Sequence, residues 1–278
     1  MPTVHLSERS LIEIAGEEAT DFLERLVTAD VEGLAEDKAV ASALLTPQGK
    51  ILFDFVISRT TDGFRADIRS DQVNDFIRRL TLYRLRAKVT FEEKSDCCVY
   101  AIWDEQATDG AIPDTRFPAE ANVFRAYGDL SSDATVSDWN ELRIAHGVAE
   151  SGADYDLSDA FPHDVLMDLN AGVDFSKGCF VGQEVVSRMK HRKTARRRVA
   201  IIAGKAALPA AGTPIEAGGK TVGTLGTVEA DKALAIVRID RVADALGNET
   251  EITAGGVPVT LKLPEWSGLA FEARTGGS

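Results

Sequence analysis

The chain of 278 residues has a formal net charge of −13, with 44% hydrophobic and 27% charged residues. This negative charge makes nucleic acid an unlikely partner and disfavours attachment to an anionic membrane surface. No apolar run approaches the roughly 18 residues that a membrane-spanning helix needs, so no membrane partner is expected. The length predicts two domains, because domains commonly contain about 100–200 residues.

The cysteine pattern indicates neither a disulfide framework nor a metal site. Cys97 and Cys98 are adjacent and Cys179 stands alone, and no C-x-x-C pair occurs. Because a typical iron–sulfur cluster takes four thiolates, we expect no metal to be bound by the chain itself. Free thiols are typical of a reducing compartment, and the first residues lack the basic and apolar regions of a secretory signal. We therefore expect a cytoplasmic protein.

The first half of the chain alternates between strand and helix patterns. Apolar residues at positions 19, 22, 23 and 26 predict one helix, and Val73, Phe76, Ile77 and Leu80 predict another. Pro47-Gln48-Gly49 has turn chemistry and separates two strand-like runs. The predicted strands cover residues 10–14, 39–45, 50–58, 64–69, 88–92 and 97–103.

The sequence pattern of the second half changes twice, near residue 104 and again near residue 196. Residues 104–135 are polar and weakly patterned, which predicts a subdomain junction there. One helix is predicted from about Ser137 to His146, and another from about Gly182 to Lys190. Beyond residue 196, short β-rich runs alternate with Gly- and Pro-rich turns, which favours a small β-barrel over 196–278 after a domain of residues 1–195. The tail, 272–278, is expected to be disordered.

Cys179 is the most informative candidate for chemistry. Gly178 and Gly182 flank it, Lys177 stands two residues before it, and a helix is expected just after it. A helix N-terminus and nearby cations favour thiolate over thiol, so Cys179 is predicted to be the key functional thiol. The alternative is an inert cysteine packed beside Phe180.

A basic segment surrounds and follows this cysteine. From Lys177 to Arg198 the chain has eight basic residues and one acidic residue, Glu184. The segment is either a solvated linker or a site for an anion or an acidic partner protein. A docking module that uses residues 188–198 is therefore one alternative function.

The run Lys177-Gly178-Cys179-Phe180-Val181-Gly182-Gln183-Glu184 resembles the K-G-C-[FY]-x-G-Q-E motif of YgfZ-like proteins, in the folate-binding GcvT superfamily. The following run, 185–192, is also similar to that family. Weaker similarities are the V-T-A-D-V segment at 27–31 and Trp139. The resemblance implies an α+β GcvT-like fold of two mixed α/β subdomains followed by a C-terminal β-barrel.

The resemblance also implies a function and a binding site. It implies that the protein binds folate, as tetrahydrofolate or a derivative, and assists assembly or repair of iron–sulfur proteins, with client or assembly proteins as partners. Classical enzymatic turnover is not expected. The residues implied to bind folate are Trp139, Lys177, Gln183, Glu184, Arg188, Thr28 and Asp30. Two positions depart from the family pattern, because Ser10 and Leu26 stand where the family has Trp and Gln.

A folate-dependent aminomethyltransferase of the same superfamily is the alternative of a different class. Its members use an Asp-Asp pair in the strand that follows the glycine turn. Alignment on Gly49-Lys50-Ile51-Leu52 places Phe53 at the first, catalytic position and Asp54 at the second. A phenyl ring cannot exchange a proton with a folate nitrogen, so the accessory-factor interpretation is favoured.

Overall fold

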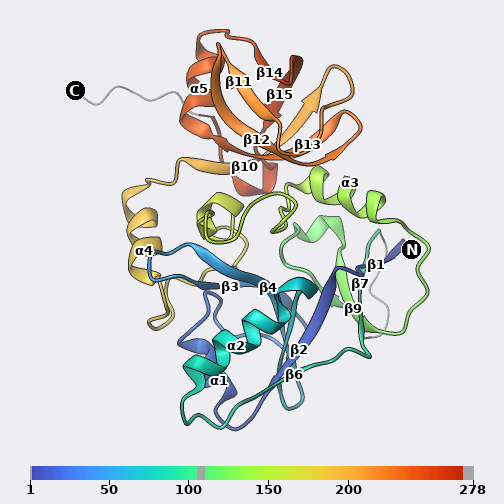
Figure 1. Ribbon diagram of the computed structural model, residues 1–278, viewed down its shortest axis with the longest axis vertical. Helices are drawn as coiled ribbons and strands as arrows, with labels where there is room; N and C mark the ends of the chain where they lie inside the picture. Colours follow the sequence, from blue (N-terminus) through green and yellow to red (C-terminus); the bar gives the residue numbers. More distant parts are fainter. Residues whose placement is uncertain (1, 105–109, 272–278) are drawn as a thin grey trace. The chain divides into compact units, whose positions relative to one another are not determined.

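The computed structural model describes residues 2–104 and 110–271 (Figure 1). Its contacts divide the chain into two compact units. The first unit comprises residues 1–136 and 167–187, and the second comprises residues 137–166 and 188–278. Helix α4 (Gln183–Arg192) crosses the division.

The first unit contains a five-stranded antiparallel sheet with the strand order β3-β4-β5-β2-β6. Its β4 strand places Phe53, Phe55 and Ile57 on the face where Phe76 and Leu80 of α2 are also buried. This alternation of apolar residues builds the core of the unit. The elements are β2 (Arg9–Ala15), α1 (Ala19–Glu24), β3 (Ala39–Leu45), β4 (Ile51–Thr60), β5 (Gly63–Arg69), η1 (Ser70–Gln72), α2 (Val73–Arg84) and β6 (Thr90–Glu93).

A second, four-stranded sheet of the first unit has the order β1-β7-β9-β8. Buried charges connect the two sheets, because Arg125 on β9 forms ion pairs with Asp67 on β5 and with Asp114 next to β8. Arg9 on β2 also pairs with Asp67. The elements are β1 (Thr3–His5), β7 (Cys98–Ile102), β8 (Ile112–Pro113), η2 (Ala119–Ala121) and β9 (Phe124–Gly128).

The second unit contains a closed barrel with the order β10-β13-β12-β11-β14-β15. Asp154 anchors a loop to β12, where the register shifts between Leu225 and Val228. Its carboxylate accepts hydrogen bonds from the backbone N–H of Thr227 at 2.7 Å and from Arg143 of α3 at 2.7 Å. The elements are α3 (Val136–His146), η3 (Pro162–Val165), β10 (Arg197–Gly204), β11 (Pro214–Ala217), β12 (Lys220–Glu229), β13 (Lys232–Arg238), α5 (Ile239–Gly247), β14 (Ile252–Ala254), β15 (Val257–Lys262) and η4 (Glu265–Ser267).

These elements confirm the predicted α+β class and the C-terminal barrel. The sequence analysis did not predict helix α5. It also missed β1, β8, β9, β11 and β14, because strands of two to five residues are too short for a clear alternation. Of the proposed junction at 104–135, residues 105–109 lie outside the described part, and the remainder contributes β8 and β9 to the first unit.

The domain boundary near residue 195 stays a prediction. The barrel begins at Arg197, while contacts group residues 137–166 with it. The tail at 272–278 lies outside the described residues. Among the helices of 2–104 and 110–271, none has the length and apolar character required to cross a membrane.

Candidate functional site

The loop before Cys179 is shaped by Asp174. One carboxylate oxygen of Asp174 accepts hydrogen bonds from the backbone N–H of Ser176 at 2.6 Å and of Lys177 at 3.2 Å, and from the Ser176 hydroxyl at 2.6 Å. The hydrogen bond from the Ser176 side chain is the main reason that the pKa of Asp174 lies below its usual value. The backbone N–H of Asp174 donates to Thr28 O at 2.9 Å. The segment 174–177 is therefore held beside the segment that follows α1.

Lys177 fixes the same two segments more firmly. Its Nζ donates to Val27 O at 3.0 Å and to Ala29 O at 2.5 Å, and it lies 3.2 Å from Glu24 Oε1. The Lys177 side chain is only 2% exposed. Burial lowers the pKa of Lys177, although Glu24 opposes the shift. The ammonium group therefore points into the protein. We call these contacts of Lys177 with Glu24, Val27 and Ala29 the lysine clamp.

The end of the loop is fixed by Gly182. Its φ is +79°, and a Cβ at this position would lie 2.6 Å from Thr46 O and 3.0 Å from Leu45 Cβ. Glycine is thus required both by the backbone conformation and by the close approach of the β3–β4 turn. Phe180 is buried, and Val181 packs against the core of the first unit.

Cys179 itself is exposed, between the lysine clamp and the packed end of the loop. A Cβ added at Gly178 would have no described atom within 4 Å, so the side-chain direction of Gly178 is open. The α4 helix begins at Gln183, four residues later. This start agrees with the helix predicted from about Gly182 to Lys190.

Thr28 and Asp30 lie beside the lysine clamp and are engaged within the protein. The Thr28 hydroxyl donates to Gly172 O at 2.6 Å and accepts from the N–H of Ala43 at 2.9 Å. Asp30 accepts from the N–H of Gly33 at 2.8 Å. The Thr28 hydroxyl and the Asp30 carboxylate, like the Lys177 amine, position backbone groups.

The remaining predicted folate residues belong to two different units. Gln183, whose side chain donates to Gly178 O at 3.4 Å, and the exposed Glu184 are in the first unit. Trp139 is 2% exposed on α3, and the exposed Arg188 follows on α4, both in the second unit. Their roles stay predictions.

Two residues of the site escaped the sequence analysis. Glu24 holds Lys177, and the carbonyl of Gly172 holds Thr28. Neither stands in a motif, and both act across about 150 residues of chain, so only the fold could reveal them. The Asp174 turn was detectable, because Asp side chains in loops commonly accept a hydrogen bond from the backbone two residues further on.

Phe53, which the alignment on residues 49–52 is expected to place at the aminomethyltransferase catalytic position, is a core side chain. Phe53 is 5% exposed, and its ring lies 5.3 Å from the ring of Phe76 in an edge-to-face arrangement. The neighbouring Asp54 is half-buried on the opposite face of β4.

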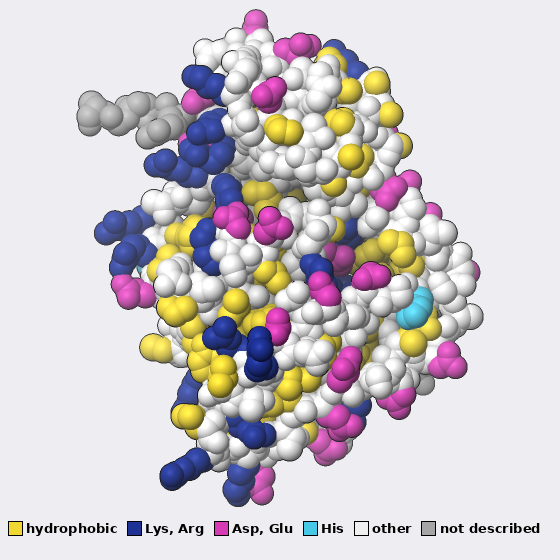
Figure 2. Space-filling model, viewed as in Figure 1, with side chains coloured by type: hydrophobic (Ala, Val, Ile, Leu, Met, Phe, Trp, Pro, Cys, Tyr) yellow, Lys and Arg dark blue, Asp and Glu magenta, His cyan; other side chains and the backbone are white. Residues whose placement is uncertain are grey.

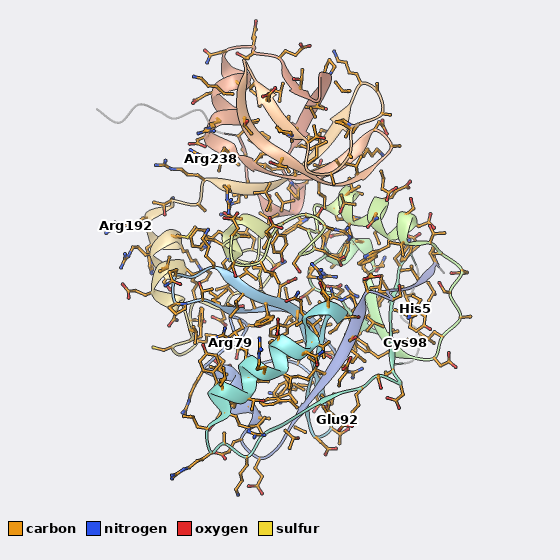
Figure 3. The ribbon with its side chains drawn as sticks, viewed as in Figure 1. His5, Arg79, Glu92, Cys98, Arg192 and Arg238 are labelled. Carbon is orange, nitrogen blue, oxygen red and sulfur yellow. The ribbon has the colours of Figure 1, made fainter. Side chains whose placement is uncertain are left out.

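The basic segment is exposed at its centre. Lys190, Arg192, Lys193 and Arg196 are all exposed. Figure 2 shows basic side chains gathered over α4, and Figure 3 shows Arg192 pointing away from that helix. Within 2–104 and 110–271, no three His, Cys, Asp or Glu side chains are grouped so that they could hold a metal ion.

Comparison with known proteins defines the fold. Residues 196–269 match the family described as "CAF17, C-terminal beta-barrel domain". The glycine cleavage system aminomethyltransferase T from Bartonella henselae superimposes with a TM-score of 0.73 at 14% identity, covering 95% of this chain and 86% of that one. The fold is GcvT-like. At this identity, the GcvT-like fold is all that the superposition establishes.

Several curated relatives are named as the iron–sulfur cluster assembly factor IBA57 or its homologs. The homolog from Coccidioides immitis is 30% identical over 235 residues, which cover 70% of this chain and 55% of the relative. The mouse protein is 25% identical, and the match covers 94% of this chain and 84% of the relative. The chain spans about half the length of the fungal relatives. These relatives are named as mitochondrial, so the prediction of a cytoplasmic protein is contradicted.

Proposed function

We propose that this chain is an iron–sulfur cluster assembly factor of the IBA57 kind. The names of its relatives and its GcvT-like fold support the proposal. The observation that carries it is the exposed Cys179, on a loop whose two sides are held by the lysine clamp and by Gly182. A thiol held in the open on a fixed loop is accessible to another protein. Because the motif at residues 177–184 resembles that of YgfZ-like proteins, the proposal in its more specific form is that the chain is a YgfZ-like assembly factor.

Cys179 acts by offering one sulfur ligand to a cluster or to a cluster-bearing partner. Thiolates are the usual ligands of iron–sulfur clusters, which take four of them. The other two cysteines lie in or beside β7, and burial raises the pKa of the Cys97 thiol. The cluster is therefore cargo whose remaining ligands come from partner proteins, which are client or assembly proteins.

Complementation of cells that lack their own relative tests this role. Cys179→Ala should fail to restore the activity of an iron–sulfur enzyme, while Cys97→Ala and Cys98→Ala should restore it. Purified Cys179→Ala should unfold at the wild-type denaturant concentration, because its side chain is exposed. Full restoration by Cys179→Ala would reduce this cysteine to a loop residue and favour docking through residues 188–198.

Binding of a reduced folate is a further part of the proposal. The GcvT-like fold is shared with an aminomethyltransferase, and Trp139 offers an aromatic ring suited to stacking on a pterin. Trp139 is buried, so a folate that reaches it must change its surroundings and its fluorescence.

Tetrahydrofolate should therefore quench the protein fluorescence with saturation, and Trp139→Phe should remove most of the quench. Trp266→Phe is the matched control and should keep the quench, because the indole N–H of Trp266 already donates to His146 O at 2.7 Å. Absence of a saturable quench at millimolar tetrahydrofolate would remove folate from the proposal and leave the role of Cys179 untouched.

A further inference from the structure

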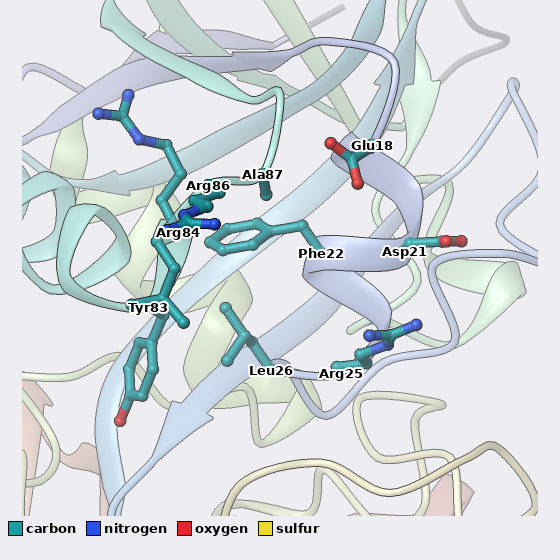
Figure 4. Close-up of a pocket in the computed structure, with 10 residues that line it drawn as sticks. Glu18, Asp21, Phe22, Arg25, Leu26, Tyr83, Arg84, Arg86 and Ala87 are labelled. Carbon is teal, nitrogen blue, oxygen red and sulfur yellow. The ribbon is translucent and has the colours of Figure 1, made fainter.

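A groove of about 420 Å³ lies in the first unit, away from Cys179 in sequence and unused by the proposed function. One wall is α1 with the turn after it, and the other is the end of α2 with the loop that follows. Figure 4 shows Phe22 and Leu26 pointing from the α1 side toward Tyr83 and Arg84. The lining residues are Glu18, Asp21, Phe22, Arg25, Leu26, Tyr83, Arg84, Leu85, Arg86 and Ala87.

The rim of the groove presents an apolar side chain to solvent. Leu85 is 88% exposed, and its backbone has φ +49° and ψ −102°, a conformation that a leucine rarely adopts. An exposed leucine on a strained backbone contributes nothing to the core of this unit. Strained backbone of this kind is common at binding sites, which makes Leu85 a candidate contact for a partner.

Three basic and two acidic side chains line the groove, so its charge is +1, whereas the whole chain has a net charge of −13. Arg25 and Arg86 are exposed and form no ion pair within residues 2–104 and 110–271. Arg84 donates to the carbonyl of Val89 at 3.4 Å. Of the two acidic residues, Glu18 accepts a hydrogen bond from the N–H of Lys88, and Asp21 is exposed on α1.

We propose that this groove docks an acidic segment of a partner protein that carries a large apolar side chain. The apolar side chain packs between Phe22, Leu26 and Tyr83, and Leu85 covers it. Carboxylates on either side pair with Arg25 and Arg86. A protein segment fits better than an anionic membrane or nucleic acid, because the chain's charge of −13 repels an extended anionic surface.

The groove also adjoins the lysine clamp. Glu24 of the clamp is followed directly by Arg25 and Leu26 of the groove, and Val181 of the cysteine loop packs against the same core as Tyr83. A partner held in the groove therefore contacts the turn that holds Lys177, two residues before Cys179. That the partner is an assembly protein rests on the proposed function, whereas the docking itself does not.

The probe is a fluorescein-labelled peptide with a phenylalanine and a leucine between glutamates, and its binding to the full chain is followed by anisotropy. Saturable binding that weakens with added salt is expected. The double variant Arg25→Glu/Arg86→Glu should weaken binding roughly tenfold or more, because each reversal replaces an attraction with a repulsion. Leu85→Ser should weaken it roughly fivefold.

Matched variants separate the groove from its surroundings. Arg79, labelled in Figure 3, lies on α2 and does not line the groove, so the charge reversal Arg79→Glu should leave binding within twofold. Leu82 is 67% exposed but does not line the groove, so Leu82→Ser is the control for Leu85→Ser. Cys179→Ala should bind the peptide as the wild type does, so that failure of the docking proposal and failure of the proposed function are distinguishable.

Three outcomes overturn the proposal. Equal binding of a peptide with lysines in place of the glutamates would show that the arginines do not select the ligand. Peptide binding unaffected by the Arg25→Glu/Arg86→Glu variant would place the peptide elsewhere. Concentration-dependent dimerisation that is lost in Leu85→Ser, without peptide binding, would assign the groove to a second copy of this chain.

Discussion

Lys177 shows how one side chain can belong to a recognisable motif and yet point away from the expected ligand. Its ammonium group contacts Glu24 and two backbone carbonyls, and its side chain is 2% exposed. A buried charge costs free energy unless it is fully bonded, and here three oxygens provide the bonding. The residue therefore contributes to the site by holding the loop that exposes Cys179.

Replacement of Lys177 by Met should lower the free energy of unfolding by about 2 kcal/mol, the usual cost of losing hydrogen bonds to a charged group. Met keeps the apolar stem, so the loss reports the ammonium contacts. Urea unfolding measures the change, and Lys193→Met, at an exposed position, is the control. A double-mutant cycle with Glu24→Gln should show that the losses in unfolding free energy at Lys177 and Glu24 are not additive. A Lys177→Met variant as stable as wild type would contradict the clamp.

At the scale of elements, buried ion pairs join the two sheets of the first unit. Asp114 is fully buried beside Arg116 and Arg125. Burial alone raises the pKa of Asp114, but the two guanidinium groups outweigh burial and hold its pKa well below the ordinary value. The pairs therefore contribute stability whenever the carboxyl group is ionised.

This lowered pKa has a definite consequence for stability against pH. The contribution of Asp114 is complete above the unfolded pKa of about 3.9 and is lost as pH falls toward the folded value. Asp114→Asn should be less stable than wild type by about 3 kcal/mol at pH 7, because it leaves buried arginines uncompensated. The difference should shrink below about pH 4. Urea unfolding across this range tests it, with the exposed Asp62→Asn as control. A difference independent of pH would mean that packing, not charge, is lost.

On the scale of the whole molecule, the division into two units predicts more than one unfolding transition. Trp103 belongs to the first unit, and Trp139 and Trp266 belong to the second. Asp154 ties α3 to the barrel, and both it and Arg143 have side chains no more than 2% exposed. Loss of the Asp154 charge should therefore destabilise the second unit more than the first.

Asp154→Asn should lower the unfolding free energy reported by Trp139 by about 2–3 kcal/mol, with a smaller effect on the transition reported by Trp103. Variants that retain a single tryptophan allow the two transitions to be followed separately. The exposed Asp156→Asn, two residues along the same loop, should change neither. Equal shifts at both tryptophans would show that the two units unfold as one.

Local patterns in the sequence were enough for the class of the fold. The alternation along β4, the helical spacing of Phe76 and Leu80, and the Gly- and Pro-rich turns after residue 196 each reflect short-range geometry. The match of residues 177–184 to a known motif likewise needed no structure. The shortest strands escaped because their pairing partners, not their own residues, define them.

Only the tertiary structure decided which polar groups face inward. Lys177 and Val27 are 150 residues apart, and Thr227 receives its partner Asp154 from 73 residues away. The groove likewise joins α1 to the end of α2, more than 50 positions further along. Whether a charged side chain meets solvent, a ligand or a buried partner depends on such long-range neighbours. The sequence alone therefore determined that Cys179 stands in a glycine-flanked basic motif, and the fold determined that the lysine beside it is buried while the cysteine is exposed.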